Sequence, residues 1–257
     1  MELSAIIMTY NEEQNIRRCL MSLRDIADEI VVVDSYSTDR TEQICREMGA
    51  IFIQHEFEGY IEQESYALGK TRYDRVLSLD ADEALSDKLR ESILSVKNNW
   101  SHDGYAFNRL TNYCGKWIRH CGWYPDVKIR LWDKKKGGWG GVNPHPRVIM
   151  QDGATVQHLD GDLLHYSYYS VRQQVEQINN FSDLAARAAD EKGKRSFFVK
   201  DILLNPLFTF IKMYVLQMGF LDGYFGFVIC ANSSFGKFLK YIKLREIRMR
   251  KNGSSSV

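Results

Sequence analysis

The sequence has little proline and no disulfide pattern. It contains 4 prolines and 5 cysteines in 257 residues, and no two cysteines form a Cys-x-x-Cys pair. An odd, scattered set of cysteines excludes the disulfide framework of a small secreted protein and favours a reducing compartment. Cys114, His120 and Cys121 lack a fourth ligand at the spacing of a zinc finger, which disfavours a structural zinc site.

An excess of either charge is also missing. The chain has 34 Lys and Arg residues against 33 Asp and Glu residues, for a formal net charge of +1. Proteins that bind nucleic acid usually carry a strong positive field, so no nucleic acid partner is expected. Positive charge gathers only near the end of the chain, where every charged residue in 237–251 except Glu246 is Lys or Arg.

Long uncharged apolar runs are absent as well. The most apolar stretch, residues 202–234, is interrupted by Pro206, Lys212 and Asp222. No uncharged run therefore reaches the roughly 18 residues that a membrane-spanning helix needs. The glycine-rich turns of P-loop and dinucleotide-binding proteins are also missing. These absences disfavour a transmembrane protein, a P-loop kinase and a Rossmann dehydrogenase.

The first half of the chain does contain strands that alternate with helices. Apolar runs predict strands over 4–8, 29–33, 50–54 and 75–79, and helical spacing predicts helices over 11–23, 37–48 and 60–70. Asn11 is a suitable cap for the first helix. Such alternation with short links is typical of a parallel sheet with helices on both faces. We therefore expect an α/β fold with a mostly parallel, Rossmann-like sheet.

The pattern changes after residue 83. Strand-like stretches at 104–112, 127–132, 147–150 and 154–158 are separated by loops, including the glycine-rich 137–141. A long helix is expected over about 171–191. We expect one domain over residues 1–195 and an apolar, basic helical extension over 196–257.

Polar side chains follow several of the predicted strands. Thr-Tyr-Asn-Glu occupies 9–12, Asp34 and Ser35 follow the second strand, and Asp-Ala-Asp-Glu occupies 80–83. Open α/β sheets bind ligands where the carboxyl ends of parallel strands meet. Paired aspartates there are suitable oxygen ligands for a divalent cation between phosphates. The sequence predicts a metal-dependent enzyme that acts on a nucleotide-activated substrate.

These motifs together resemble the family 2 glycosyltransferases, which have the GT-A fold. The order of Thr-Tyr-Asn-Glu at 9–12, Val-Val-Val-Asp-Ser at 31–35 and Leu-Asp-Ala-Asp-Glu at 79–83 is that of the family. The later segments Gly-Trp-Tyr-Pro-Asp at 122–126 and Leu-His-Tyr-Ser-Tyr at 164–168 are similar to a subgroup with lipopolysaccharide inner-core glucosyltransferases. The resemblance implies an inverting transfer of a hexose, with glucose from UDP-glucose as the expected donor. It implies a lipopolysaccharide core or another lipid-linked, membrane-anchored glycan as the acceptor.

The resemblance also implies site residues. Asp34 would contact the nucleoside, with Thr9 and Glu12 in the same pocket. Asp80 would face the ribose or the metal. Asp82 would bind Mg²⁺ or Mn²⁺, and His165 would complete the metal or diphosphate site. The full set expected at the donor comprises Thr9, Tyr10, Asn11, Glu12, Asp34, Ser35, Asp80 and Ala81.

Three residues are candidates for the general base. Many relatives have an acid beside the position of His145, but here Pro146 stands there. Asp126 is the first candidate, His145 the second and Glu83 the third. The structural alternatives are a salt bridge from Asp126 to Lys128 or Arg130, and a loop histidine that packs on Trp139.

The end of the chain predicts a basic amphipathic helix over 235–251. Such a helix, after the aromatic-rich 208–227, suits the surface of an anionic leaflet, although docking on the core or an oligomer contact would give the same pattern. The chain begins without a basic and apolar leader. We therefore expect a cytoplasmic protein, peripheral on the inner face of a bacterial membrane. Two other functions stay open: a nucleotidyltransferase, and a non-catalytic binding relative.

Overall fold

The computed structural model describes residues 1–143 and 145–254. By its contacts the chain forms two compact units. We call Met1–Leu110 with Pro125–Tyr166 the sheet unit, and Thr111–Tyr124 with Ser167–Val257 the helical unit. The helical unit thus begins earlier in the chain than the extension expected from residue 196.

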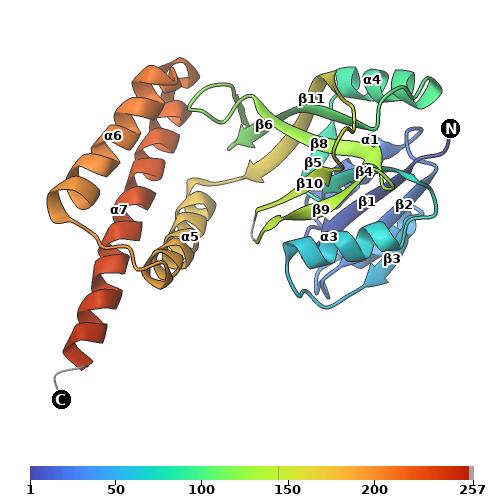
Figure 1. Cartoon of the computed structure of the whole chain (residues 1–257). Coiled ribbons are helices and arrows are strands. Elements are labelled where there is room, and N and C mark those ends of the chain that lie inside the picture. Colours follow the sequence, from blue (N-terminus) through green and yellow to red (C-terminus); the bar gives the residue numbers. More distant parts are fainter. Residues whose placement is uncertain (144, 255–257) are drawn as a thin grey trace. The chain divides into compact units, whose positions relative to one another are not determined.

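A mixed sheet forms the centre of the sheet unit (Figure 1). Its strands are β1 (Ser4–Thr9), β2 (Glu29–Asp34), β3 (Ile51–Gln54), β4 (Arg75–Asp80), β5 (Glu83–Leu85), β6 (Gly104–Tyr113), β8 (Asp126–Asp133) and β11 (Val156–Tyr168), and β7 (Lys116–Ile118) belongs to the segment assigned to the helical unit. They follow the order β3-β2-β1-β4-β8-β6-β11-β5, and β7 pairs with β6. The strands β3, β2, β1 and β4 are parallel, as predicted. The pairs β4/β8, β8/β6 and β11/β5 are antiparallel, so only the first half of the sheet is parallel.

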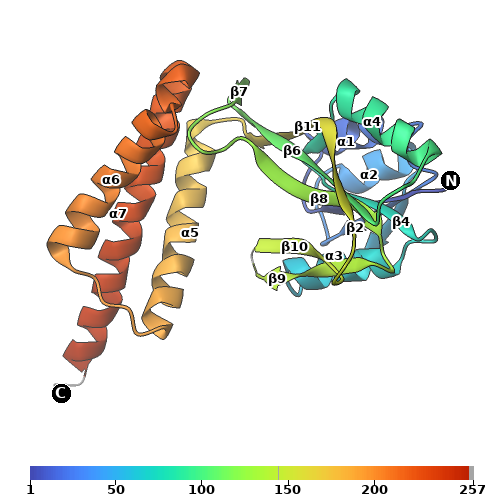
Figure 2. The same cartoon turned by 45° about the horizontal axis from the view of Figure 1, so that its top comes forward.

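Helices cover both faces of the parallel strands, as the alternation predicted. The helices are α1 (Ile16–Leu23), α2 (Thr41–Glu47), α3 (Tyr60–Gly69) and α4 (Asp87–Asn98). Successive side chains of β1 point to opposite faces. Ala5 and Ile7 therefore share a core with α1, α2 and α4, whereas Ile6 packs with Ala67 of α3. Figure 2 shows α3 and α4 on opposite sides of the sheet.

The glycine-rich stretch predicted as a loop is a strand. β9 (Gly137–Val142) pairs antiparallel with β10 (His145–Met150). A Cβ on Gly137 would lie 2.6 Å from Met150 Sδ, and one on Gly140 would lie 2.7 Å from Ile149 Cδ1. Glycine is needed at positions 137 and 140 because side chains of β10 lie directly over the backbone of β9 there, which composition alone does not reveal.

The helical unit is built on two long helices. Its elements are α5 (Val171–Glu191), η1 (Phe198–Leu204), α6 (Asn205–Ile211), η2 (Lys212–Leu216), η3 (Gly219–Asp222) and α7 (Gly223–Ser254). α5 has the predicted bounds and begins with a capping box of Ser170 and Gln173. α7 includes the predicted tail helix and packs along α5, burying Leu244 against Ala186 and Ala189.

No single helix among the described residues has the length and apolar character of a membrane span. Phe198–Leu216 and Gly219–Lys251 meet these criteria only as a pair, and they are bent by 70° at their junction.

Candidate active site

The ends of three neighbouring strands carry the acidic residues singled out in the sequence. In the register of the sheet, Thr9 at the end of β1 lies beside Asp34 of β2, and Met8 lies beside Asp80 of β4. Asp34 is fully buried, and Asp80 is partly exposed. The parallel half of the sheet therefore brings Asp34 and Asp80 to one edge of the same unit.

Asn11 joins the loops after β1 and β2. Its backbone N–H donates to Ser37 Oγ over 2.7 Å, and its Oδ1 accepts from the Thr38 backbone N–H over 2.8 Å. Asp34 in turn accepts from the Ser37 backbone N–H over 2.8 Å and from the Ser37 hydroxyl. The expectation that Asn11 caps a helix is wrong, because α1 begins only at Ile16 and the side chain of Asn11 is used between the loops.

This edge also presents an unsatisfied buried hydroxyl and two exposed aromatic rings. Thr9 Oγ1 is buried and has no hydrogen-bond partner among the described residues. Buried hydroxyls are nearly always bonded, so an orphan at a strand end indicates a place for a ligand atom. Tyr10 and Tyr36 are 58% and 55% exposed. Tyr36 has a positive φ of 62°, a strained conformation for a bulky residue that often marks functional loops. Sequence reasoning missed Tyr36, although it lies directly between Ser35 and Ser37.

Glu12 carries a perturbed carboxyl group next to the same loops. Burial and the negative charges of Asp82, Asp39 and Asp80 raise its pKa to about 7, although a hydrogen bond from Asn15 opposes this. The effect of the two aspartates of the β4–β5 turn shows that they and Glu12 share one electrostatic environment. Three acids besides Glu12 therefore contribute negative charge to this environment.

The turn between β4 and β5 contains Ala81 and Asp82. The Asp80 backbone N–H donates to Glu83 Oε2 over 2.9 Å, which holds the turn closed. On the other side, β11 pairs with β5, with His165 opposite Glu83. His165 Nε2 lies 3.2 Å from Asp82 Oδ2, so the two residues expected at the metal are in contact. Although burial opposes it, the Asp82 carboxylate raises the pKa of His165.

A divalent cation fits this turn only with help from a substrate. The described residues contain no group of three or more His, Cys, Asp or Glu side chains that is arranged to hold a metal ion. Mg²⁺ is commonly held by one or two carboxylates together with substrate phosphates, not by a complete protein cage. Asp82 and His165, close to the negative charge on Asp80, satisfy that pattern.

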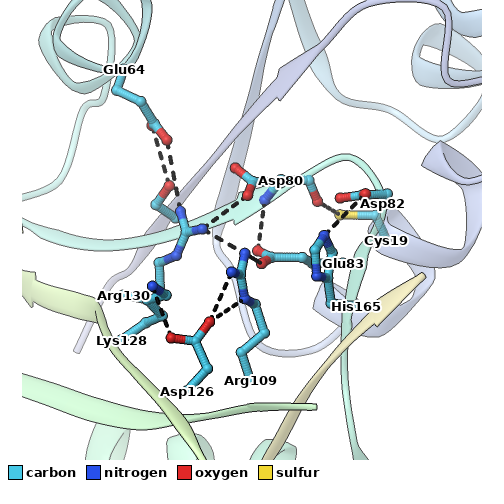
Figure 3. A network of polar contacts seen from close by, with 11 residues as sticks. Cys19, Glu64, Asp80, Asp82, Glu83, Arg109, Asp126, Lys128, Arg130 and His165 are labelled. Atoms are coloured by element: carbon cyan, nitrogen blue, oxygen red, sulfur yellow. Dashed lines mark hydrogen bonds and ion pairs between the residues drawn. The ribbon is translucent and has the colours of Figure 1, made fainter. Parts of the chain in front are cut away.

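Behind the turn lies a buried network of charges (Figure 3). The Arg130 guanidinium is 2.9 Å from Asp80 Oδ2, 3.5 Å from Glu83 Oε1 and 3.7 Å from Glu64 Oε1. Arg109 contacts Glu83 as well, over 3.4 Å. Burial alone would raise the pKa of Asp80, but the positive charges of Arg130 and Arg109 outweigh it, so the pKa of Asp80 lies below its usual value. Burial raises the pKa of both Glu64 and Glu83.

Asp126 stands at the start of β8, beside this network. Arg109 Nη2 is 2.8 Å and Lys128 Nζ is 2.9 Å from its carboxylate, so the salt bridge considered in the sequence analysis exists to Lys128 but not to Arg130. These two cations outweigh burial and lower the pKa of Asp126. Asp126 remains 33% exposed and ionised. Glu83 is completely buried, so it is inaccessible to an acceptor hydroxyl. The side chain of His145 lies outside the described part of the chain.

The sequence of the sheet unit identifies the family. Residues 4–155 match the family described as Glycosyl transferase family 2. The chain belongs to this family. Its membership rules against the nucleotidyltransferase alternative. The expected GT-A-type fold is confirmed as a mixed sheet flanked by helices.

Two relatives extend the similarity over almost the whole chain. A glycosyltransferase of Rickettsia typhi is 30% identical over 97% of this chain and 88% of its own length. The lipopolysaccharide core biosynthesis glycosyltransferase LpsC of Rhizobium meliloti is 28% identical over 94% of this chain and 91% of its own. This family 2 glycosyltransferase therefore shares both of its units with curated glycosyltransferases.

A solved structure with partial likeness is glucosyl-3-phosphoglycerate synthase of Mycobacterium tuberculosis, in complex with Mn²⁺, UDP and glucosyl-3-phosphoglycerate. It has a TM-score of 0.36 and 21% identity, over 43% of this chain and 44% of its own. A likeness of this extent adds nothing to the family assignment.

Proposed function

We propose that this chain is an inverting, metal-dependent hexosyltransferase that uses a UDP-hexose, with UDP-glucose as the first candidate. The observation that carries the proposal is the meeting of Asp34, Asp80 and the orphaned Thr9 hydroxyl at one sheet edge, with Asp82 in the adjoining turn. Carboxylates and a hydroxyl in this arrangement are suited to bind the nucleobase, the ribose and the diphosphate of a donor side by side.

The nucleoside side of the donor belongs to the loops after β1 and β2. Asp34 accepts hydrogen bonds from N–H or O–H groups of the nucleotide-sugar, and the Thr9 hydroxyl forms a hydrogen bond with the same ligand. The exposed ring of Tyr10 offers a face on which a base stacks. Asn11, Glu12 and Ser35 form the walls of the pocket through their loop bonds.

The diphosphate side belongs to the β4–β5 turn. Asp82 and His165 would hold Mg²⁺ or Mn²⁺, with Asp80 and Ala81 against the ribose and phosphates. When bound, the cation offsets the negative charge that develops on the departing UDP. Arg130 holds Asp80 ionised and in place, and it acts on the donor only through Asp80.

The chemical step is a single displacement at the anomeric carbon. An oxygen of the acceptor hydroxyl forms the new bond to C1 while the bond from C1 to the UDP oxygen breaks, and that oxygen keeps the electron pair. Asp126 takes the hydroxyl proton. Its partial exposure allows an acceptor to reach it, and the cations of Arg109 and Lys128 keep it deprotonated until the transfer.

The acceptor is a lipopolysaccharide core or another lipid-linked glycan, and the enzyme works at the inner face of the cytoplasmic membrane. Support for this acceptor comes from the similarity to LpsC, which is named for lipopolysaccharide core biosynthesis.

A donor panel tests the proposal. Purified protein is given UDP-sugars with Mn²⁺, and release of UDP is measured with and without a core glycan acceptor. We expect release from one UDP-hexose, and a loss of about 10³-fold in Asp82→Ala. Asp152→Ala, an exposed turn aspartate of the same unit, is the matched control and should keep wild-type activity. Equal UDP release by Asp82→Ala and Asp152→Ala would overturn the metal assignment.

A further inference from the structure

The helical unit exposes an unusual amount of apolar surface. Fifteen large apolar side chains between residues 197 and 227 are each at least 43% exposed. Phe198, Leu207, Phe208 and Leu216 are among them, at 57%, 56%, 60% and 68%. We call the exposed side chains of 197–227 the apolar surface. Exposed apolar patches of this extent are rare on monomeric soluble proteins and usually mark an interaction site.

The elements that carry this surface have little packing of their own. Neither α6 nor η2 has a single buried residue. Their inner side chains, such as Phe210 and Tyr214, are only partly buried against α7. A stretch of helix this apolar and this exposed is not explained by the core of the unit. It needs a partner that covers it.

Charges around the apolar surface are of one sign. Residues 192–240 contain seven Lys or Arg residues and two acids, Asp201 and Asp222. Both acids are buried: Asp201 accepts from the Phe197 backbone N–H, and Asp222 accepts from the backbone and ring of His120. All of the basic residues except Lys240 are exposed. The exposed charges within residues 192–240 are therefore all positive.

The basic residues are close enough to affect each other. Burial, together with the positive charges of Lys237, Lys194 and Lys192, lowers the pKa of Lys240. A pocket of about 580 Å³ is lined by Arg195 and Ser196, which directly precede the apolar surface in the chain, and by Arg245, Arg248, Lys251, Met249 and Asp190. Arg248 and Lys251 pair with Asp190 in this pocket. Ser196 Oγ is buried and has no hydrogen-bond partner among the described residues. Four cations and one acid line the pocket and two of the cations pair with that acid, so the lining as a whole is positive.

We propose that the apolar surface docks on an anionic lipid bilayer, with its aromatic and aliphatic side chains in the acyl boundary and the surrounding cations on the phosphates. The partner is chosen by charge. A second copy of this chain would place like charges against each other across a symmetric contact, whereas anionic headgroups complement them. The inference rests on the proposed function only in that its acceptor is membrane-anchored.

The structure also changes which part of the chain binds. The tail helix, with the aromatic-rich 208–227 before it, was expected at the membrane, but three basic residues of the tail helix pair with acids of α5. Lys243 contacts Asp183, and both Arg248 and Lys251 contact Asp190 of α5. Tyr241 and Ile247 pack toward α5. The binding surface lies mainly before residue 228, and the tail helix supports it.

Vesicle co-sedimentation of the full chain tests the proposal. Wild-type protein should bind vesicles of phosphatidylcholine with phosphatidylglycerol, and it should bind pure phosphatidylcholine at least tenfold more weakly. Leu207→Ser/Phe208→Ser should weaken binding to the anionic vesicles by about tenfold or more, because both side chains leave the acyl boundary. Met21→Ser/Ile51→Ser, two exposed apolar residues of the sheet unit, is the matched control and should bind like the wild type.

A second pair of variants tests the charges. Arg195→Gln/Arg245→Gln should reduce the preference for anionic over neutral vesicles by about tenfold, since each cation near the surface contributes to binding. Arg17→Gln/Arg46→Gln changes the net charge equally in the sheet unit and should leave that preference unchanged.

Two results would overturn the inference. One is wild-type vesicle binding by Leu207→Ser/Phe208→Ser. The other is a lipid-free dimer that this variant converts to a monomer in analytical ultracentrifugation, which would assign the surface to a second copy. The variant should still release UDP from a UDP-hexose at the wild-type rate. Loss of vesicle binding with intact UDP release separates this inference from the proposed function, and Asp82→Ala should show the reverse.

Discussion

The two units of this glycosyltransferase depart from ordinary protein surfaces in opposite ways. The sheet unit buries charge: Glu64, Glu83 and Arg130 lie inside it with less than a tenth of each side chain exposed. The helical unit exposes apolar surface instead, around residues 197–227. Buried charges cost free energy unless they are paired, and exposed apolar groups cost free energy unless they are covered. The comparison teaches that the first unit concentrates paired, buried charge and the second concentrates exposed apolar area.

The largest expected effect concerns the buried network. Arg130→Met should lower the free energy of unfolding by about 3 to 5 kcal/mol, because it leaves Glu64 buried without its cation and Glu83 with Arg109 alone. Arg172→Met on α5, whose ion pair with Glu176 is exposed, should change it by about 0.5 kcal/mol or less. Urea denaturation of both variants measures this. Equal effects would mean that the network does not determine the stability of the sheet unit.

The helical unit offers a sharper contrast within itself. Leu244→Ala should cost about 2 to 4 kcal/mol, because Leu244 is fully buried between α5 and α7. Leu216→Ala should cost about 0.5 kcal/mol or less, because Leu216 is 68% exposed. Thermal denaturation in the absence of lipid measures both. A large cost for Leu216→Ala would show that the apolar surface is covered within the protein.

Asp126→Asn isolates the proposed base. Turnover should fall by about 10²-fold or more while UDP binding stays close to the wild type, because the carboxylate acts on the acceptor proton and not on the donor. Asp152→Asn is the control, since it alters an exposed carboxylate in the same unit. Steady-state kinetics and UDP titration give the two quantities. Unchanged turnover in Asp126→Asn would make His145 the next candidate for the general base.

The smallest effect is a pH dependence at Glu12. Its folded-state pKa is about 7, above the usual 4.5, so the folded protein binds more protons than the unfolded chain between these values. The free energy of unfolding should therefore fall as pH rises from about 4.5 to 7. Glu12→Gln should reduce this fall by about 1 to 2 kcal/mol in metal-free protein, allowing for partial exposure. The exposed Glu91→Gln should leave the profile unchanged. An unaltered profile in Glu12→Gln would contradict the shared negative environment.

Local patterns predicted much of the fold. Apolar runs located β1, β2, β3 and β4, and helical spacing gave the bounds of α5, because these features depend on a few neighbouring residues. The strand β9 could not be predicted, since Gly137 and Gly140 are explained only by Met150 and Ile149 across the hairpin. Likewise, β11 runs to Tyr168, well beyond the stretch expected at 154–158, because pairing with β5 extends it.

The site was predictable where motifs carry it and not where distant residues meet. The strand-end acids are visible in the sequence as motifs. The network around Arg130 joins Glu64, Glu83 and Arg109, which come from different elements and show no common pattern. The exposure of the apolar surface could not be predicted either, because an apolar stretch has the same sequence pattern whether it is buried or exposed.

UDP binding with and without Mn²⁺ tests the central claim most directly, that the acids at these strand ends form one nucleotide and metal site. Calorimetry should show that Mn²⁺ strengthens UDP binding to the wild type by about tenfold or more. Asp82→Ala should bind UDP with the metal-free affinity under both conditions, and Asp34→Asn should bind it weakly under both. Wild-type affinity and Mn²⁺ dependence in both variants would contradict the account.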